Sequence, residues 1–263
     1  MKDLRLQQQR KRRTQLMFAG GTGGAIVVIV IIVLIAVLTG GGTPKKSAVV
    51  TTTTTSTPAQ TTTTAAQTHI SVPLIQAGDK VGCPKFNGSS PHYTRFLQAP
   101  PMCINADKVY TAKMVTDVGT ITIKLLPKQS LQSVNNFVFL ALYHFYDGTE
   151  FHRVIPGFVD QGGDPTGTGE GGPGYSFNGG APKTAKVYTA GAFAMANSGT
   201  SASDGSQFFI VVGTGGQQLQ PLYSYFGQVT GGISVVNKIN TDGTSAGTPK
   251  VIHKVLKVTI SQS

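Results

Sequence analysis

Arg153 is the side chain of this sequence whose surroundings best suit chemistry. It lies in a short stretch, residues 151–164, where large apolar residues surround the arginine and a glutamine leads into Gly-Gly-Asp. If two strands flank Gly157, where a glycine lets the chain bend, alternation places Phe151, Arg153 and Ile155 on one face. An arginine among aromatic residues indicates recognition of a substrate. The alternative is an arginine whose aliphatic stem covers a hydrophobic sheet while its charge stays in water.

Three motifs in this chain carry a family resemblance. The stretch above reads F-H-R-V-I-P-G-F-V-D-Q-G-G-D, and it is followed by A-M-A-N-S-G at 194–199 and G-S-Q-F-F-I at 205–210. Together, and in this order, they resemble the cyclophilins, the cyclosporin-type peptidyl-prolyl cis-trans isomerases. The resemblance covers about residues 109–261. It implies a mainly β fold, a closed eight-stranded antiparallel β-barrel capped by two α-helices, in an exported or membrane-anchored bacterial form.

The activity that this resemblance implies is rotation about the bond before proline. The peptide C–N bond is partly double, which gives a rotation barrier of about 18–20 kcal/mol. No group is transferred, so we expect no nucleophile, acid–base pair, cofactor or metal. The catalyst must favour the twisted amide over both planar forms. A guanidinium suits this because it stays charged and presents a planar fork of donors.

The family's site residues carry over onto this chain position by position. Arg153 matches the catalytic arginine and Gln161 the glutamine that orients it, while Phe158 joins them in the catalytic set. The resemblance assigns substrate binding to the proline pocket (Val159, Phe209, Leu219 and Tyr223), the groove for the preceding residues (Ala196, Asn197 and Ser198) and Gln207. For each pocket aromatic the alternative is ordinary core. By alternation, Phe208 should point inward and be core alone.

The chain departs from the family pattern at three places in the pocket. Val159 stands where the most-studied members have Met, and Tyr223 stands where His is common. A Trp that matters for cyclosporin binding in the family is missing near Leu219, where this chain has Gln217 and Gln218. We therefore expect a wider pocket, weak cyclosporin affinity and retained isomerase activity.

The positioning elements follow from alternation, turn residues and helical periodicity. Many short strands with two helices favour a closed antiparallel barrel. The Gly-rich loop 162–174 has no G-K-[ST] and is not expected to bind phosphate. We expect a hairpin of strands 109–117 and 120–125, helices at 130–143 and 233–239, and strands at 151–155, 158–161, 190–196, 207–212, 225–229 and 251–260.

The chain before residue 109 has a different composition. Residues 1–15 form a basic tail, and residues 1–13 hold +5 of the chain's net charge of +11. Residues 16–39 are uncharged and long enough to cross about 30 Å of bilayer as a helix. Since basic residues stay on the cytoplasmic side, we expect a single-pass transmembrane signal-anchor with the C-terminal domain outside. The alternative is a cleaved signal peptide and a secreted protein, but the length and the lack of an Ala-x-Ala site favour the anchor.

Two further segments precede the predicted domain. Residues 40–68 are rich in Thr and lack large apolar residues, which predicts a disordered linker. Residues 69–108 form an N-terminal extension with the chain's only cysteines, Cys83 and Cys103. Both follow the apolar run, in a compartment where disulfides persist, so we expect them to pair. The alternative is two free thiols.

The sequence is compatible with three classes of function. We expect an exported isomerase that acts on proline-containing polypeptides as a monomer. The alternatives are a non-catalytic proline-binding chaperone or interaction module at the cell surface, and an adhesin that uses its basic charge. The retained Arg153 favours the enzyme. No nucleic-acid partner is expected, because no basic run recurs in the predicted domain, and no metal, because the five His have no paired spacing.

Overall fold

The computed structural model describes residues 69, 71–78 and 81–263. The predicted basic tail, transmembrane segment and disordered linker lie outside the described residues. Within that part of the chain, no helix has both the length and the apolar character needed to cross a membrane.

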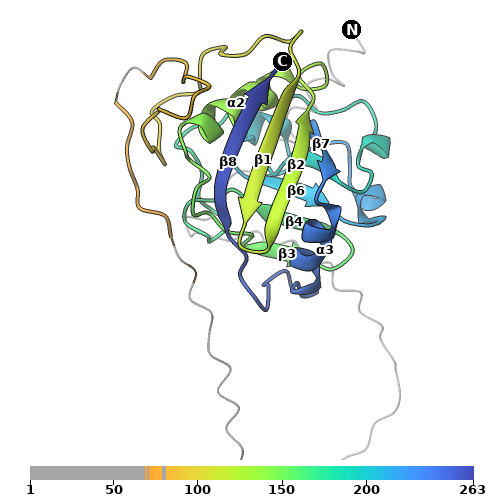
Figure 1. The fold of residues 1–263 in the computed structure, drawn as a ribbon. Helices are drawn as coiled ribbons and strands as arrows, with labels where there is room; N and C mark the ends of the chain where they lie inside the picture. The colour runs from red at the N-terminus through yellow and green to blue at the C-terminus, as the bar shows by residue number, and fades with distance from the viewer. Residues whose placement is uncertain (1–68, 70, 79–80) are drawn as a thin grey trace, which may run out of the picture. The chain divides into compact units, whose positions relative to one another are not determined.

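Eight strands form one antiparallel sheet, in the order β3-β4-β6-β5-β7-β2-β1-β8, that curls strongly around its interior (Figure 1). No ladder joins the two edge strands, β3 and β8, in the described chain. The segments just before them meet instead through an isolated bridge between Glu150 and Lys254. The strands are β1 (Tyr110–Thr116), β2 (Gly119–Leu125), β3 (Arg153–Ile155), β4 (Val159–Gly162), β5 (Ala192–Met195), β6 (Phe208–Val211), β7 (Tyr225–Gly231) and β8 (Val255–Gln262). Eight antiparallel strands were predicted and are confirmed.

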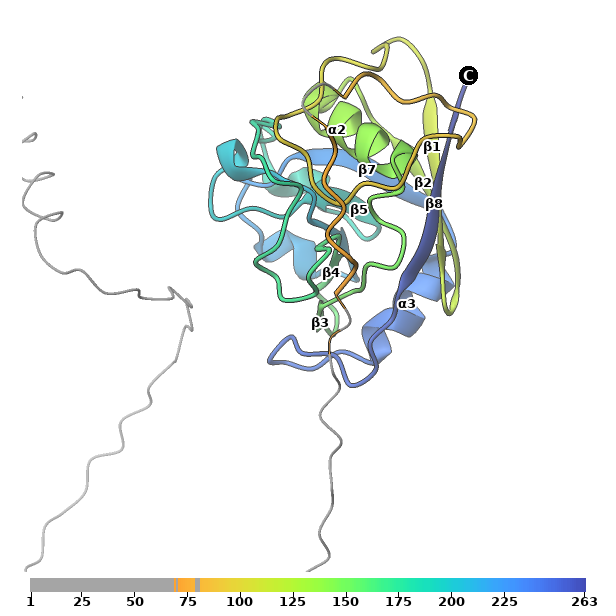
Figure 2. The same ribbon diagram turned by 90° about the vertical axis from the view of Figure 1, so that its left-hand side faces the viewer.

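Two α-helices lie at opposite ends of the curled sheet (Figures 1 and 2). Helix α2 (Leu131–Leu142) begins after Ser130, whose side chain accepts a hydrogen bond from the Ser133 backbone N–H. Such a cap satisfies one of the free donors of the first turn. Helix α3 (Ile233–Thr241) packs against β2, β3 and β4. Both helices were predicted from the sequence.

The apolar side chains divide into two clusters. The larger one fills the space inside the sheet and is rich in aromatic rings, with Phe137 of α2 at its centre. Phe208 belongs to it and is fully buried, as predicted. The smaller cluster lies on the other face of β4, β5 and β6. It consists of Val159, Tyr188, Ala192, Ala194, Phe209 and Val211, with half-buried neighbours that include Phe158, Leu219 and Tyr223.

Two sequence predictions about strands were wrong. Strand β3 begins only at Arg153, so Phe151 does not share a face with it. Phe151 is fully buried instead, and its ring centroid lies 6.2 Å from that of Phe208. The last strand begins at Val255, not at 251, because the backbone N–H of Lys254 is bound to the Asp117 carboxylate as the chain turns into the strand.

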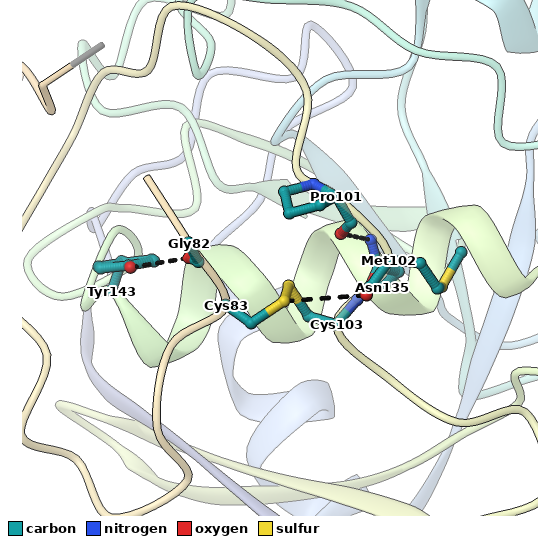
Figure 3. The surroundings of a disulfide bond; sticks show 7 residues. All are labelled: Gly82, Cys83, Pro101, Met102, Cys103, Asn135 and Tyr143. Atoms are coloured by element: carbon teal, nitrogen blue, oxygen red, sulfur yellow. Dashed lines mark hydrogen bonds between the residues drawn. A yellow bond between two sulfur atoms is a disulfide. The ribbon is translucent and has the colours of Figure 1, made fainter. Parts of the chain in front are cut away.

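The extension packs on the outer face of α2, and its two cysteines are paired (Figures 2 and 3). The disulfide Cys83–Cys103 joins positions 20 residues apart. Within the loop that it closes, Phe96 is buried, with its ring 5.1 Å from Phe139 of α2. Asn135 of α2 accepts a hydrogen bond from the Cys103 N–H at 2.7 Å. The predicted pairing is present, and the extension is part of the folded domain.

Candidate active site

The β3–β4 hairpin brings Arg153 and Gln161 together. The two residues are directly paired across the ladder. Arg153 Nη1 donates to Gln161 Oε1 at 3.1 Å, which fixes the direction of the guanidinium. The arginine is half-buried, and this burial lowers its pKa. It nevertheless stays protonated, because arginine is not deprotonated in proteins.

A chain of amide side chains continues from the arginine into the Gly-rich loop. Gln161 Nε2 donates to Gln207 Oε1 at 3.0 Å. Gln207 Nε2 in turn donates to the carbonyl oxygens of Gly169 and Gly171, both at 2.8 Å. The two predicted glutamines therefore belong to one network that runs from Arg153 to the loop 162–174.

The smaller apolar cluster lies beside this network, because Phe209 is paired with Gln161 on the neighbouring strand. Within it, Phe209 and Tyr223 meet edge to face with ring centroids 5.3 Å apart. Phe158, Leu219 and Tyr223 are only half-buried, so part of their apolar surface faces solvent. Partly exposed apolar groups next to a fixed cation can bind an apolar ring while the cation contacts a polar amide attached to that ring. The structure brings all the predicted pocket residues together.

A groove borders the same network and is lined in part by Gln161 and Gln207. One wall contains Ala196, Asn197 and Ser198, and the other is formed by the loop from Gly169 to Ser176. The space between them has a volume of about 430 Å³. Asn197 is held by two hydrogen bonds of 3.0 Å, to Asp204 Oδ1 and to the Leu222 carbonyl. Its amide therefore has a structural role in this state, while the backbone of the segment borders the groove.

Asp204 holds the groove wall in place through its hydrogen bond to Asn197. It is fully buried and also accepts a hydrogen bond from the Ser224 hydroxyl at 2.5 Å. Burial raises the pKa of this carboxyl to about 6, although its hydrogen bonds to Ser224, Asn197 and the Gly179 N–H oppose the increase. Sequence reasoning did not single out Asp204.

Tyr188 and Asn240 also support the site and were missed. The Tyr188 hydroxyl donates to the Tyr223 carbonyl at 2.7 Å and accepts from its N–H at 3.0 Å, which holds Tyr223 at the pocket. Asn240 of α3 accepts from the Gly157 N–H at 2.8 Å and donates to the Ile155 carbonyl at 3.0 Å. It therefore fixes the turn of the hairpin. Asn240 lies directly after the second predicted helix, at 233–239, and the observed helix extends to Thr241 and so includes it.

Gly247 is a further missed contributor, because it lies against the stem of Arg153. Its φ is +93°, and a Cβ atom there would lie 3.2 Å from the arginine Cγ. Its carbonyl accepts from the Val154 N–H at 2.8 Å, which supports the edge strand β3. A glycine is favoured here both by the positive φ and by the close approach.

Comparisons with known proteins agree with this geometry. The family model of cyclophilin type peptidyl-prolyl cis-trans isomerases matches residues 111–260. Peptidyl-prolyl cis-trans isomerase B of Bacillus subtilis is 42% identical over 131 residues, which cover 48% of this chain and 87% of that protein. An isomerase of Helicobacter pylori is 40% identical over 134 residues, covering 50% of this chain and 81% of the relative.

Solved structures show the same fold. A crystal structure of a Cryptosporidium parvum cyclophilin type isomerase superposes with a TM-score of 0.54 at 29% identity, and it covers 59% of this chain and 99% of that one. The same protein crystallised in the presence of the dipeptide Ala-Pro gives a TM-score of 0.53, also at 29% identity, with 58% and 99% of the two chains covered. With a family model that spans more than half of its length, this chain belongs to the cyclophilin-type peptidyl-prolyl cis-trans isomerases.

Proposed function

We propose that this peptidyl-prolyl cis-trans isomerase uses Arg153 as its catalytic side chain. The observation that carries the proposal is the placement of a fixed cation, bound to Gln161, beside an apolar cluster whose outer members Phe158 and Tyr223 are only half-buried. The proline ring would enter the pocket between Phe158, Phe209 and Tyr223. The residues before the proline would lie along the groove at 196–198.

The chemistry in this arrangement is stabilisation of a twisted amide. In the planar amide the nitrogen lone pair is conjugated with the carbonyl and accepts hydrogen bonds poorly. As the bond rotates, conjugation is lost and the lone pair becomes an acceptor. A guanidinium aimed at that nitrogen therefore binds the transition state more strongly than either ground state, which is the requirement for catalysis. Because the hydrogen bond to Gln161 already orders the arginine side chain, little further conformational entropy is lost when the transition state forms.

Replacing Arg153 with Ala tests this role. We expect kcat/KM for an Ala-Pro peptide to fall by about 10²–10³-fold, as for loss of a preorganised donor. Peptide binding should survive, because the pocket is made by other residues. The matched control is Lys113→Ala, which removes an exposed cation from β1. An Arg153→Ala variant with full activity would refute the assignment. Binding without any catalysis by the unchanged chain would favour the non-catalytic proline-binding module.

We propose further that the domain acts outside the membrane and is tethered by residues 16–39. The support is the uncharged run at 16–39, the basic residues before it, and the Cys83–Cys103 disulfide, since disulfides persist in oxidising compartments. Exported proline-containing polypeptides would then be the substrates. External protease on intact cells should digest the domain if this is so. Full protection until lysis would place the domain inside.

We infer that the curled sheet closes as a barrel and that the domain acts as a monomer. Glu150 supports closure because it bridges both Asp164, next to β4, and Lys254, next to β8. Light scattering of the detergent-solubilised chain would test the monomer. Weak cyclosporin binding stays a prediction, to be measured by inhibition of the same isomerase assay.

A further inference from the structure

One buried side chain of α2 is hydrogen-bonded to both walls of the groove. Asn136 Oδ1 accepts from the Tyr175 hydroxyl at 2.6 Å, and its Nδ2 donates to the Gly205 carbonyl at 2.8 Å. Tyr175 belongs to the wall formed by the Gly-rich loop, and Gly205 belongs to the wall opposite. Helix α2 therefore joins both walls, in addition to Gln207, whose side chain donates to the Gly169 and Gly171 carbonyls.

The neighbouring residue on α2 binds the disulfide-bearing extension. Asn135 accepts from the Cys103 N–H at 2.7 Å and donates to the Pro101 carbonyl at 2.9 Å (Figure 3). Both atoms lie at the end of the loop that the disulfide closes. Two consecutive asparagines of α2 therefore have different partners: Asn135 binds the extension, and Asn136 binds the walls of the groove.

The extension also contacts the Gly-rich loop directly. The Phe96 N–H donates to the Pro173 carbonyl at 2.7 Å, and the Val72 N–H donates to the Pro165 carbonyl at 2.7 Å. At Gly174, whose φ is +96°, a Cβ atom would lie 2.4 Å from the Phe96 carbonyl oxygen. The Gly-rich loop 162–174 is therefore hydrogen-bonded to the backbone of the extension near both of its ends, and the bond at Pro173 lies within the groove wall.

We propose that the extension is a positioning element for the groove, and that the Cys83–Cys103 disulfide sets how firmly it holds the loop wall. This inference rests on the proposed function, since the groove is taken to bind the residues before the proline. The disulfide keeps Phe96 seated against α2 and so keeps its backbone against Pro173. Opening the disulfide frees that segment, and the loop wall loses its support. Binding of residues in the groove weakens, while Arg153 keeps its hydrogen bond to Gln161 and the apolar cluster beside it is unchanged.

The test compares the oxidised chain with the reduced chain and with the Cys83→Ser/Cys103→Ser variant. Two proline peptides are used, one with a single residue before the proline and one extended by several. For the extended peptide we expect KM to rise on the order of tenfold, as for a misplaced binding surface, with little change in kcat. The short peptide should show no change. Asn135→Ala should act in the same direction, and Gln132→Ala, at an exposed position of the same helix, serves as its matched control.

Hydrogen exchange provides a readout that does not depend on catalysis. On reduction, the N–H groups of Gly169 and Gly171, which donate to the Asp164 carboxylate, should exchange faster, whereas those of β1, β2 and β8 should not. Unchanged exchange in the loop and an unchanged KM for the extended peptide would overturn the proposal. Uniformly faster exchange would also do so, since it would indicate that the disulfide stabilises the whole domain. If the oxidised chain itself catalyses nothing, the proposed function fails instead.

Discussion

The interior of the curled sheet and the proposed proline pocket are built from opposite faces of the same strands. On β6, Phe208 and Ile210 point into the interior, while Phe209 and Val211 belong to the pocket cluster. On β5 the interior receives Phe193 and Met195, and the pocket side receives only the small Ala192 and Ala194. One alternating pattern therefore supplies both a core and a binding surface.

The two faces differ in how completely they are covered. The interior aromatics are fully buried and meet each other at ring-centroid distances such as the 4.9 Å between Phe193 and Phe208. The pocket side is capped only by half-buried residues, among them Phe158 and Leu219. The sealed face supplies stability, and the outer face keeps apolar surface that the proposed binding of a proline ring would use.

The strongest test of this comparison replaces neighbouring phenylalanines on β6. Phe208→Ala should lower the free energy of unfolding by about 3–5 kcal/mol, because it leaves a closed cavity among aromatic rings. Phe209→Ala should cost less stability, since the space that it leaves opens toward solvent, but should raise KM for proline peptides. Urea unfolding and the isomerase assay measure the two effects. If both variants lost the same amount of stability, Phe209 would be as fully packed as Phe208, and the difference between the two faces would be refuted.

Asp160 of β4 offers a second test of the difference between the two faces of the sheet. In sequence it lies between Val159 of the smaller apolar cluster and Gln161 of the amide network. It is fully buried, and only its Oδ1 has a partner, Asn240 Nδ2 at 2.7 Å. Burial raises its pKa to about 7. Because the pKa in the unfolded chain is near the ordinary 3.8, the folded state binds the proton more tightly. This contribution to stability is complete below about pH 4 and is lost as the pH rises through 7.

Asp160→Asn should remove that pH dependence. The amide keeps an acceptor for Asn240 but has no charge to desolvate, so the variant should be more stable at pH 8 by an amount on the order of a few kcal/mol. Thermal or urea unfolding from pH 4 to pH 8 measures the difference between variant and parent. The control is Asp107→Asn, at an exposed position. A difference that does not vary with pH would contradict the buried-carboxyl account.

The smallest effect is expected from Val159→Met, which restores the larger residue of well-studied family members. Val159 is 2% exposed but lies beside half-buried residues, so the longer side chain should lower the free energy of unfolding by no more than about 1–3 kcal/mol. KM for a short proline peptide should fall slightly, as the ring gains contacts. A large loss of stability would mean that Val159 is packed on all sides, like the interior residues.

Local patterns predicted much of this architecture. Alternation predicted that Phe208 would be core, and the helical periodicity of residues 130–143 predicted α2. The assignment of Phe209 to the pocket came from the family resemblance. The pattern failed at Phe151, because alternation holds only where a strand exists, and β3 begins two residues later. Where a short strand begins depends on its partners in the sheet, and those are distant in the sequence.

The sequence by itself determined which residues could carry the chemistry, since Arg153, Gln161 and the pocket positions lie in short motifs of distinctive composition. Only the tertiary structure decided what holds them in place. Gly247 reaches the stem of Arg153, Asn240 reaches the turn at Gly157, and the extension reaches the Gly-rich loop, all across long sequence separations. Such contacts depend on how the sheet curls and where the helices pack, and no local pattern of residue types encodes them.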